Sequence, residues 1–170
     1  MSEAVFIPLN IAILTVSDTR TSETDKSGDT LQACVEQAGH VAAVRAIAKD
    51  DIYQIRSVVS QWIASDAIHA VLITGGTGFT ARDSTPEAMI PLFDKQIEGY
   101  GELFRSLSYG EIGTSTIQSR TVAGVANRTV IFCMPGSTGA CKTAWNKIIA
   151  EQLDRRHRPC NFVEMVLQRG

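Results

Sequence analysis

The chain of 170 residues is poor in aromatic side chains and has no excess of charge of one sign. Phe, Trp and Tyr make up 6% of the residues, too few for the row of stacking rings with which proteins bind single-stranded nucleic acids. The formal net charge is −2, so no surplus of Lys and Arg is available to neutralise nucleic-acid phosphates or an anionic membrane. We therefore expect no nucleic-acid partner and no membrane partner.

Cysteine pairs of the kind that bind zinc or exchange electrons are also missing. No two of the four cysteines have CxxC spacing, and the three histidines are scattered away from any cysteine pair. We expect free thiols in a reducing compartment, and no structural metal. The cysteines are Cys34, Cys133, Cys141 and Cys160.

Long hydrophobic runs are absent as well. Residues 1–4 contain no basic stretch, and the longest early apolar run covers only residues 11–16. Neither a signal peptide nor a membrane span fits this pattern, so we expect a cytoplasmic protein. The hydrophobic content of 44% is ordinary for a globular chain, and residues 1–170 are expected to form a single domain.

Short apolar runs alternate with longer segments of helical periodicity. This alternation predicts an α/β fold with a mostly parallel sheet. The last two runs are expected to form an antiparallel hairpin around residues 126–128. The runs of strand length cover residues 11–16, 41–48, 70–74, 120–125 and 129–134.

Several residues mark the expected ends of helices. Gly39 stops the first helix, and Thr85 with Pro86 begins a later one as N-cap and first residue. Pro91 bends or breaks that helix. The cluster Arg155–Arg158 is interpreted as the end of the last helix, where cations favour the dipole.

Three polar loops follow apolar strands and therefore share the carboxyl edge of the predicted sheet, where ligands bind in such folds. The first begins with Ser17 and Asp18, the second covers residues 75–83, and the third covers residues 135–139. Gly75, Gly76 and Gly78, with Thr77 between them, suit a backbone cradle for phosphate. A plain turn remains the alternative.

Known phosphate motifs fit these glycines poorly. No lysine follows them, as a P-loop requires. The pattern Gly76-x-Gly78-x-x-Ala81 meets the dinucleotide fingerprint in part, which leaves a dinucleotide-dependent oxidoreductase as a weak alternative.

Two acidic positions allow more than one interpretation. Asp83 comes soon after the glycines and is either a loop residue or a ligand of Mg²⁺ that bridges to a bound phosphate. Asp50, beside Asp51, is either a helix cap or a partner in the same chemistry. The residues alone do not decide between these roles.

Taken in order along the chain, the motifs resemble the molybdopterin-binding MoaB/MogA family. The similarity extends roughly over residues 8–165, the expected core of the domain. The motifs that carry it are TVSD at residues 15–18, TGGTGFTARD at 74–83, TPE at 85–87, GYG at 99–101 and MPG at 134–136.

The resemblance implies a three-layer α/β/α domain that assembles as a homotrimer or hexamer. It also implies binding of molybdopterin and transfer of AMP from Mg-ATP to the terminal phosphate of this pterin, with release of pyrophosphate. A non-catalytic pterin-binding or carrier protein is the alternative, and other cofactor-biosynthesis proteins are possible partners.

Matching positions assign roles in this sequence. Asp83 and Asp50 correspond to the family's catalytic, Mg²⁺-binding aspartates. The glycine loop at residues 75–78 corresponds to its phosphate and pterin cradle. Other ligand-lining positions are Ser17, Asp18, Thr85, Glu87, Pro135, Gly136, Ser137 and Thr138.

Overall fold

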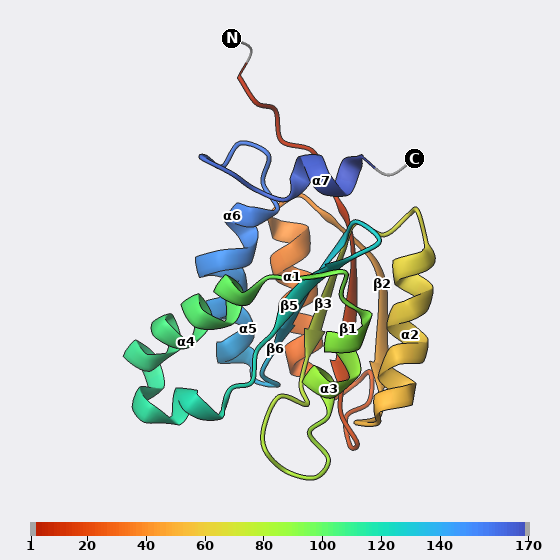
Figure 1. Cartoon of the computed structure of the whole chain (residues 1–170), viewed down its shortest axis with the longest axis vertical. Coiled ribbons are helices and arrows are strands. Elements are labelled where there is room, and N and C mark those ends of the chain that lie inside the picture. Colours follow the sequence, from red (N-terminus) through yellow and green to blue (C-terminus); the bar gives the residue numbers. More distant parts are fainter. Residues whose placement is uncertain (1–2, 169–170) are drawn as a thin grey trace.

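The computed structural model describes residues 3–168, and a six-stranded sheet with helices on both faces forms its centre (Figure 1). Its strands are β1 (Asn10–Val16), β2 (Val41–Ala48), β3 (Ala70–Thr74), β4 (Lys95–Gln96), β5 (Ala123–Ala126) and β6 (Thr129–Met134). They lie in the order β2-β1-β3-β6-β5-β4. β1, β2, β3 and β6 run parallel, whereas β5 and β4 are antiparallel to their neighbours. The predicted mostly parallel α/β fold is confirmed.

Helices cover the sheet in two layers, so the predicted three-layer architecture is also confirmed. The helices are α1 (Lys26–Gln37), α2 (Ile52–Ala64), α3 (Thr85–Met89), α4 (Glu98–Ile112), α5 (Thr138–Ala144), α6 (Ala150–Gln152) and α7 (Val163–Leu167). Ile13 and Leu72 pack with α1, α4, α5 and α7, while Leu14 and Ile73 pack with α2 and α3 on the other face (Figure 1). This burial on both faces explains why the central strands are apolar throughout.

Two helix ends agree with their sequence signals. Gly39 has φ of +90° just after α1, a conformation that side chains with a Cβ rarely adopt. Asp51 caps α2, because its side chain accepts hydrogen bonds from the N–H groups of Tyr53 and Gln54.

The start of α3 differs by one residue from its prediction. Ser84 occupies the N-cap position, and Thr85 is already the first helical residue, which places Pro86 second. The predicted cap was wrong because the hydroxyl of Thr85 is used elsewhere: it donates to the carbonyl of Gly75 at 2.8 Å. Near Pro91 the α-helix does end, and a 3₁₀ turn, η1 (Ile90–Leu92), follows it.

The predicted hairpin between β5 and β6 is confirmed, with a two-residue turn. Asn127 and Arg128 have φ of +47° and +60°, as a type I′ turn requires. The first strand begins at Ala123 rather than at Arg120, because the N–H of Arg120 donates to the carbonyl of Thr77 instead of to a strand.

The basic cluster at residues 155–158 does not end the last helix, as its interpretation required. It lies in the loop between α6 and α7. Arg155 pairs there with Glu164 at 2.6 Å, and Arg156 with Asp154 at 2.7 Å. Nearby carboxylates therefore take the place of the helix dipole as partners.

A few elements had no sequence prediction of their own or were longer than expected. The short strand β4, the 3₁₀ turn η2 (Gly113–Gln118) and helix α7 were not anticipated. Leu103, Phe104 and Leu107 have helical spacing, and the helix that contains them, α4, extends beyond them in both directions. A π-helical segment, η3 (Trp145–Ile149), joins α5 to α6. No helix within residues 3–168 is long and apolar enough to cross a membrane. Predictions for residues 1–2 and 169–170, at the ends of the chain, lie outside the described residues.

Candidate functional site

A cleft of about 440 Å³ opens at the carboxyl ends of β1, β3 and β6, where three loops leave the sheet. The glycine loop (residues 75–78) follows β3 directly, as predicted. The structure brings many of the predicted site residues together here. The residues that line the cleft are Val16, Asp18, Asp50, Gly75, Gly76, Thr77, Gly78, Arg82, Asp83, Gln118, Ser119, Pro135 and Gly136.

Two of the glycines are required by the path of the backbone itself. Gly75 has φ of +102°, and a Cβ on it would lie 2.2 Å from the carbonyl oxygen of Val16. Gly76 has φ of +69°, and a Cβ there would lie 2.3 Å from Oγ1 of Thr85. The loop is therefore wedged between the end of β1 and the start of α3, which fixes its shape.

The amide groups of the glycine loop differ in their availability. The N–H of Gly75 donates to the carbonyl of Met134 at 3.0 Å. By contrast, the N–H groups of Gly76, Thr77 and Gly78 have no acceptor within residues 3–168. Successive free amides form a concavity of positive potential, which is suited to an anion such as phosphate.

Arg120 fixes the outer side of this loop, although it is more than 40 residues away in the sequence. Its N–H donates to the carbonyl of Thr77, Nε to that of Gly78 and Nη2 to that of Asp83. Nη1 forms an ion pair with Glu87 on α3. Each of its three guanidinium nitrogens thus donates to the loop or to α3.

Asp83 lies at the end of this loop against Gly78. Its Oδ2 accepts hydrogen bonds from the N–H and the hydroxyl of Thr80, at 2.8 and 2.7 Å. Oδ1 receives no hydrogen bond from the described residues. The carboxylate is half-buried and lines the cleft, so one of its oxygens has a structural role and the other is free.

The two carboxylate oxygens of Asp50 also differ in their contacts, but Asp50 is more deeply buried than Asp83, with 8% of its surface exposed. Its Oδ1 accepts from the N–H of Ser84 at 2.9 Å and from the hydroxyl at 2.6 Å. Oδ2 is directed at Gly76, where an added Cβ would lie 3.0 Å away. The cap of α2 is Asp51, so Asp50 is not a helix cap.

The two aspartates bear on whether Mg²⁺ fits this cleft. No group of three possible metal-ligating side chains gathers anywhere within residues 3–168. Mg²⁺ usually binds one or two carboxylates and takes its other ligands from water and substrate phosphates. The free oxygens of Asp50 and Asp83 fit that donor set, provided that a phosphorylated ligand shares the ion.

Asp18 and Arg82 form an ion pair across the cleft. The Arg82 guanidinium donates from Nη2 to Oδ1 at 2.8 Å and from Nε to Oδ2 at 2.9 Å. The N–H of Asp50 donates to Oδ1 of Asp18 at 3.1 Å. The hydrogen bonds from Arg82, above all, lower the pKa of Asp18 to about 2.

Ser17 and Thr85 belong to the predicted ligand-lining set but face the protein rather than the cleft. The hydroxyl of Ser17 accepts from the N–H groups of Thr19 and Arg20 and shapes the turn after β1. Thr85 is fully buried, and its hydroxyl bonds to Gly75. Both residues support the loops without lining the cleft.

The remaining predicted residues are split between two places. Pro135 and Gly136 line the cleft. Ser137 caps α5, because its hydroxyl accepts from the N–H of Ala140 at 3.1 Å, and Thr138 is the first residue of that helix. Glu87 lies outside the cleft, in an adjacent groove of about 630 Å³.

Gln118 and Ser119 were not predicted, although both line the cleft. They arrive at the end of η2, which has neither a glycine cluster nor an apolar strand before it. Arg120 beside them was predicted only as the start of a strand. No signal in the sequence placed this segment next to the glycine loop, because the contact is between distant parts of the chain.

The geometry does not support a dinucleotide fold at these glycines. In that fold a helix begins at the glycine motif and directs its N-terminus at the pyrophosphate. Here residues 79–83 form a loop, and α3 begins only at Thr85. The partial match of Gly76-x-Gly78-x-x-Ala81 was therefore misleading.

Comparison with known proteins agrees with this architecture. Residues 12–155 match the family described as "Probable molybdopterin binding domain". The chain is 62% identical over 157 residues to molybdenum cofactor biosynthesis protein B of Escherichia coli K12, which covers 92% of each chain. A crystal structure of a molybdenum cofactor biosynthesis protein B superposes with a TM-score of 0.84 at 46% identity, over 86% of this chain and 92% of that one. A third relative is described as the molybdopterin biosynthesis enzyme MoaB of Thermus thermophilus, with a TM-score of 0.72 at 30% identity over 80% and 86% of the two chains. This chain therefore belongs to the molybdopterin-binding MoaB/MogA family.

Proposed function

We propose that the protein acts in molybdenum cofactor biosynthesis, by binding molybdopterin in the cleft and transferring AMP from Mg-ATP to its terminal phosphate. The observation that carries this proposal is the group of three free amides at residues 76–78 beside the carboxylates of Asp50 and Asp83. Each of these carboxylates has one oxygen hydrogen-bonded to the protein and one that accepts no hydrogen bond from the described residues. Amide donors suit phosphate oxygens, and paired carboxylates suit a divalent ion that accompanies a nucleotide.

The proposed transfer needs positioning more than a protein nucleophile. An oxygen of the molybdopterin phosphate attacks the α-phosphorus of ATP, the bond to the bridging oxygen of the β-phosphate breaks, and pyrophosphate leaves with its electron pair. The attacking phosphate is already ionised near neutral pH, so no side chain has to accept a proton. Catalysis then rests on holding the two phosphates in line and on stabilising charge.

The placement of the nucleophilic and basic side chains agrees with this chemistry. His40 and His69 accept hydrogen bonds from the N–H groups of Leu9 and Asn10, at the end of the sheet opposite the cleft. Cys141 lies nearer the cleft, but burial raises the pKa of its thiol to about 11, so it stays protonated.

Asp83 and Asp50 are the residues that would hold Mg²⁺. When bound, the ion would neutralise negative charge on the triphosphate. The amides of residues 76–78 would bind phosphate oxygens, and Arg120 would keep these amides in place by its bonds to the carbonyls of Thr77 and Gly78.

Purified protein with molybdopterin, Mg²⁺ and labelled ATP tests this proposal through the release of pyrophosphate. Release that depends on both substrates supports transfer. Binding of molybdopterin without release supports a second function, a non-catalytic pterin-binding or carrier protein.

We also propose that residues 1–170 act as one domain and assemble as a homotrimer or hexamer. Several large apolar side chains are exposed along α4 and η2, in the groove that contains Glu87, and at Phe79 in the loop between β3 and α3. Exposed apolar patches of this kind mark protein interfaces. They are Phe79, Ile90, Leu103, Tyr109, Ile112 and Ile117. The four free cysteines agree with a cytoplasmic location, and other proteins of cofactor biosynthesis are further candidate partners.

A further inference from the structure

The ion pair between Asp18 and Arg82 joins two walls of the cleft. Asp18 belongs to the loop after β1, and Arg82 belongs to the loop after β3, 64 residues later. Both residues line the cleft together with the free amides of residues 76–78. The pair therefore lies where an anion bound to those amides would meet the guanidinium.

Arg82 differs from Arg120, the other cation beside the glycine loop, in what its guanidinium binds. Arg120 donates to backbone carbonyls and to Glu87, and these contacts shape the loop. Among the described residues, Arg82 donates only to Asp18, and 60% of its side chain is exposed. Nothing in the fold of the loop depends on this guanidinium, so it is free to change its partner.

A phosphate group can replace the carboxylate in this pair. The planar guanidinium binds carboxylate and phosphate by the same geometry, with two parallel N–H···O bonds. A polyphosphate at the amides of residues 76–78 would therefore compete with Asp18 for Arg82. The backbone also holds the carboxylate of Asp18 in place, because the N–H of Asp50 donates to its Oδ1.

We propose that Asp18 is an internal competitor of the anionic ligand: it holds Arg82 before the ligand binds, and binding of a polyphosphate transfers Arg82 from Asp18 to the ligand. This inference rests on the proposed function, since it takes the cleft as a polyphosphate site. It assigns to Asp18 an effect opposite to that of a ligand-binding residue, because the carboxylate lowers the affinity for the anion. Arg82 becomes the residue that selects a polyphosphate.

Isothermal titration calorimetry with inorganic pyrophosphate, the expected leaving group, tests this exchange without any need for turnover. Asp18→Asn keeps the acceptor for the N–H of Asp50 and removes the charge that holds Arg82. We expect pyrophosphate to bind about fivefold more tightly to this variant, the scale of one exposed ion pair. Arg82→Gln should bind it several-fold more weakly than the wild type, and the double variant should bind like Arg82→Gln.

The double variant separates the exchange from a general effect of charge. If Asp18→Asn tightens binding equally in the presence and absence of Arg82, the carboxylate acts by long-range repulsion, and the proposed exchange is wrong. Weaker binding to Asp18→Asn would show that Asp18 itself serves the ligand and would also overturn it. Asp29→Asn, which removes an exposed charge that does not line the cleft, is the matched control and should leave the affinity unchanged.

The outcomes for the two proposals can be told apart. If neither the wild type nor any variant binds pyrophosphate, the cleft is not a polyphosphate site, and both proposals fall. If pyrophosphate binds but the two substitutions act independently, only the exchange falls. If the two substitutions are coupled as expected and no AMP is transferred, the exchange stands and the carrier function replaces catalysis.

Discussion

Asp83 and Asp50 are similar in that each uses one carboxylate oxygen to support a loop and has the other directed to the cleft or free of protein donors. They differ in burial, since Asp50 is nearly inaccessible and Asp83 is half-buried. Asp50 therefore contributes more to the fold, and its substitution would change the stability of the protein together with its activity. Asp83 is the better position at which to test catalysis alone.

Asp83→Asn is expected to lower AMP transfer by about 10²-fold or more, the scale of one strong electrostatic contact. The amide oxygen can still accept from Thr80, so the midpoint of thermal unfolding should change little. Pterin binding should persist, because the amides of residues 76–78 are unchanged. Pyrophosphate release measured beside the unfolding curve checks this, and undiminished release would remove Asp83 from the reaction.

Tyr100 is a residue whose hydroxyl the fold does not use. It is 3% exposed, and its hydroxyl has no hydrogen-bond partner within residues 3–168. Burial raises the pKa of this phenol well above its usual value, so it remains neutral. A buried hydroxyl without a partner costs about 1–3 kcal/mol.

Tyr100→Phe should therefore leave the free energy of unfolding unchanged or raise it by about 1 kcal/mol. Urea unfolding of the two proteins measures this difference. A loss of more than about 1 kcal/mol would show that the hydroxyl has a partner after all, such as a bound water.

Local signals in the sequence indicated which loops meet at the cleft. Asp18, Asp50 and Asp83 lie in loops that follow predicted strands, and all three line the cleft. Ser17 and Thr85 were expected to line it but are held by nearby backbone groups. Such short polar side chains bond locally as readily as they bind a ligand, and spacing does not reveal which they do.

Among the elements, α1 is tied to two strands by a buried carboxylate. Asp25, at the N-cap of α1, is 1% exposed. It accepts from the hydroxyl of Thr15 on β1 at 2.7 Å and pairs with Arg45 on β2 at 2.9 Å. Burial by itself raises the pKa of Asp25, but the hydrogen bonds from Arg45, Thr15 and the N–H of Gly28 outweigh it and lower the value.

Because this pKa is lower in the folded state, the charge stabilises the fold above the unfolded value of about 3.9, and this contribution is lost as the pH falls through the folded value. Asp25→Asn should cost about 3 kcal/mol at neutral pH and progressively less below about pH 4. Urea unfolding across this range measures the difference. The control, Asp29→Asn, removes a more exposed partner of Arg45 and should lower the free energy of unfolding by less than about 1 kcal/mol. If the cost of Asp25→Asn does not change with pH, the prediction is wrong.

Elements with a continuous apolar pattern were predictable. β3 has the predicted bounds, because a strand buried on both faces must be apolar over its whole length. β2 also has the predicted bounds, although it is an edge strand with only Ala48 buried. β4 consists of two exposed residues and has no such pattern. The early end of β5 follows from the contacts of Arg120 with the glycine loop, a tertiary effect that no local pattern contains.

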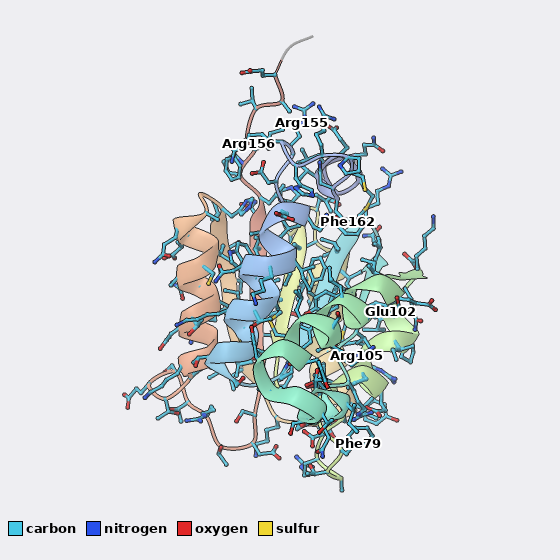
Figure 2. All side chains as sticks on the ribbon, turned by 90° about the vertical axis from the view of Figure 1, so that its left-hand side faces the viewer. Phe79, Glu102, Arg105, Arg155, Arg156 and Phe162 are labelled. Carbon is cyan, nitrogen blue, oxygen red and sulfur yellow. The ribbon has the colours of Figure 1, made fainter. Side chains whose placement is uncertain are left out.

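For the whole molecule, the question is what covers the exposed apolar side chains along α4 and η2. Ile117 is 72% exposed and lies in the groove beside the cleft. In Figure 2 the face that carries Arg105 is toward the viewer, and Phe79 lies at its lower end. The guanidinium of Arg120, which holds the glycine loop, lies over the ring of Phe79, 5.1 Å from its centroid. The face with the exposed apolar side chains therefore adjoins the residue that fixes this loop.

Light scattering at micromolar concentration should give the mass of three or six chains. Ile117→Asp, which places a charge in the apolar patch, should shift this mass toward that of one chain while the monomer stays folded. Tyr53→Asp, on α2 at the other face of the sheet and 74% exposed, is the matched control and should leave the mass unchanged. A monomeric wild type would rule out the assembly.

The strand order has a consequence for how the chain is made. β3 is the most apolar strand and the centre of the sheet, yet its neighbour β6 is translated 55 residues later. While the ribosome delivers the intervening segment, β3 has an unpaired edge of backbone groups, which is a template for association with other nascent chains. The three loops that form the cleft are also synthesised at different times, because the loop with Asp18 is made early and the loop with Pro135 is made late. Aggregation of newly made protein, and its relief by chaperones, should therefore centre on this one delayed pairing, and a chain that stops before β6 lacks the part of the cleft that Pro135 and Gly136 form.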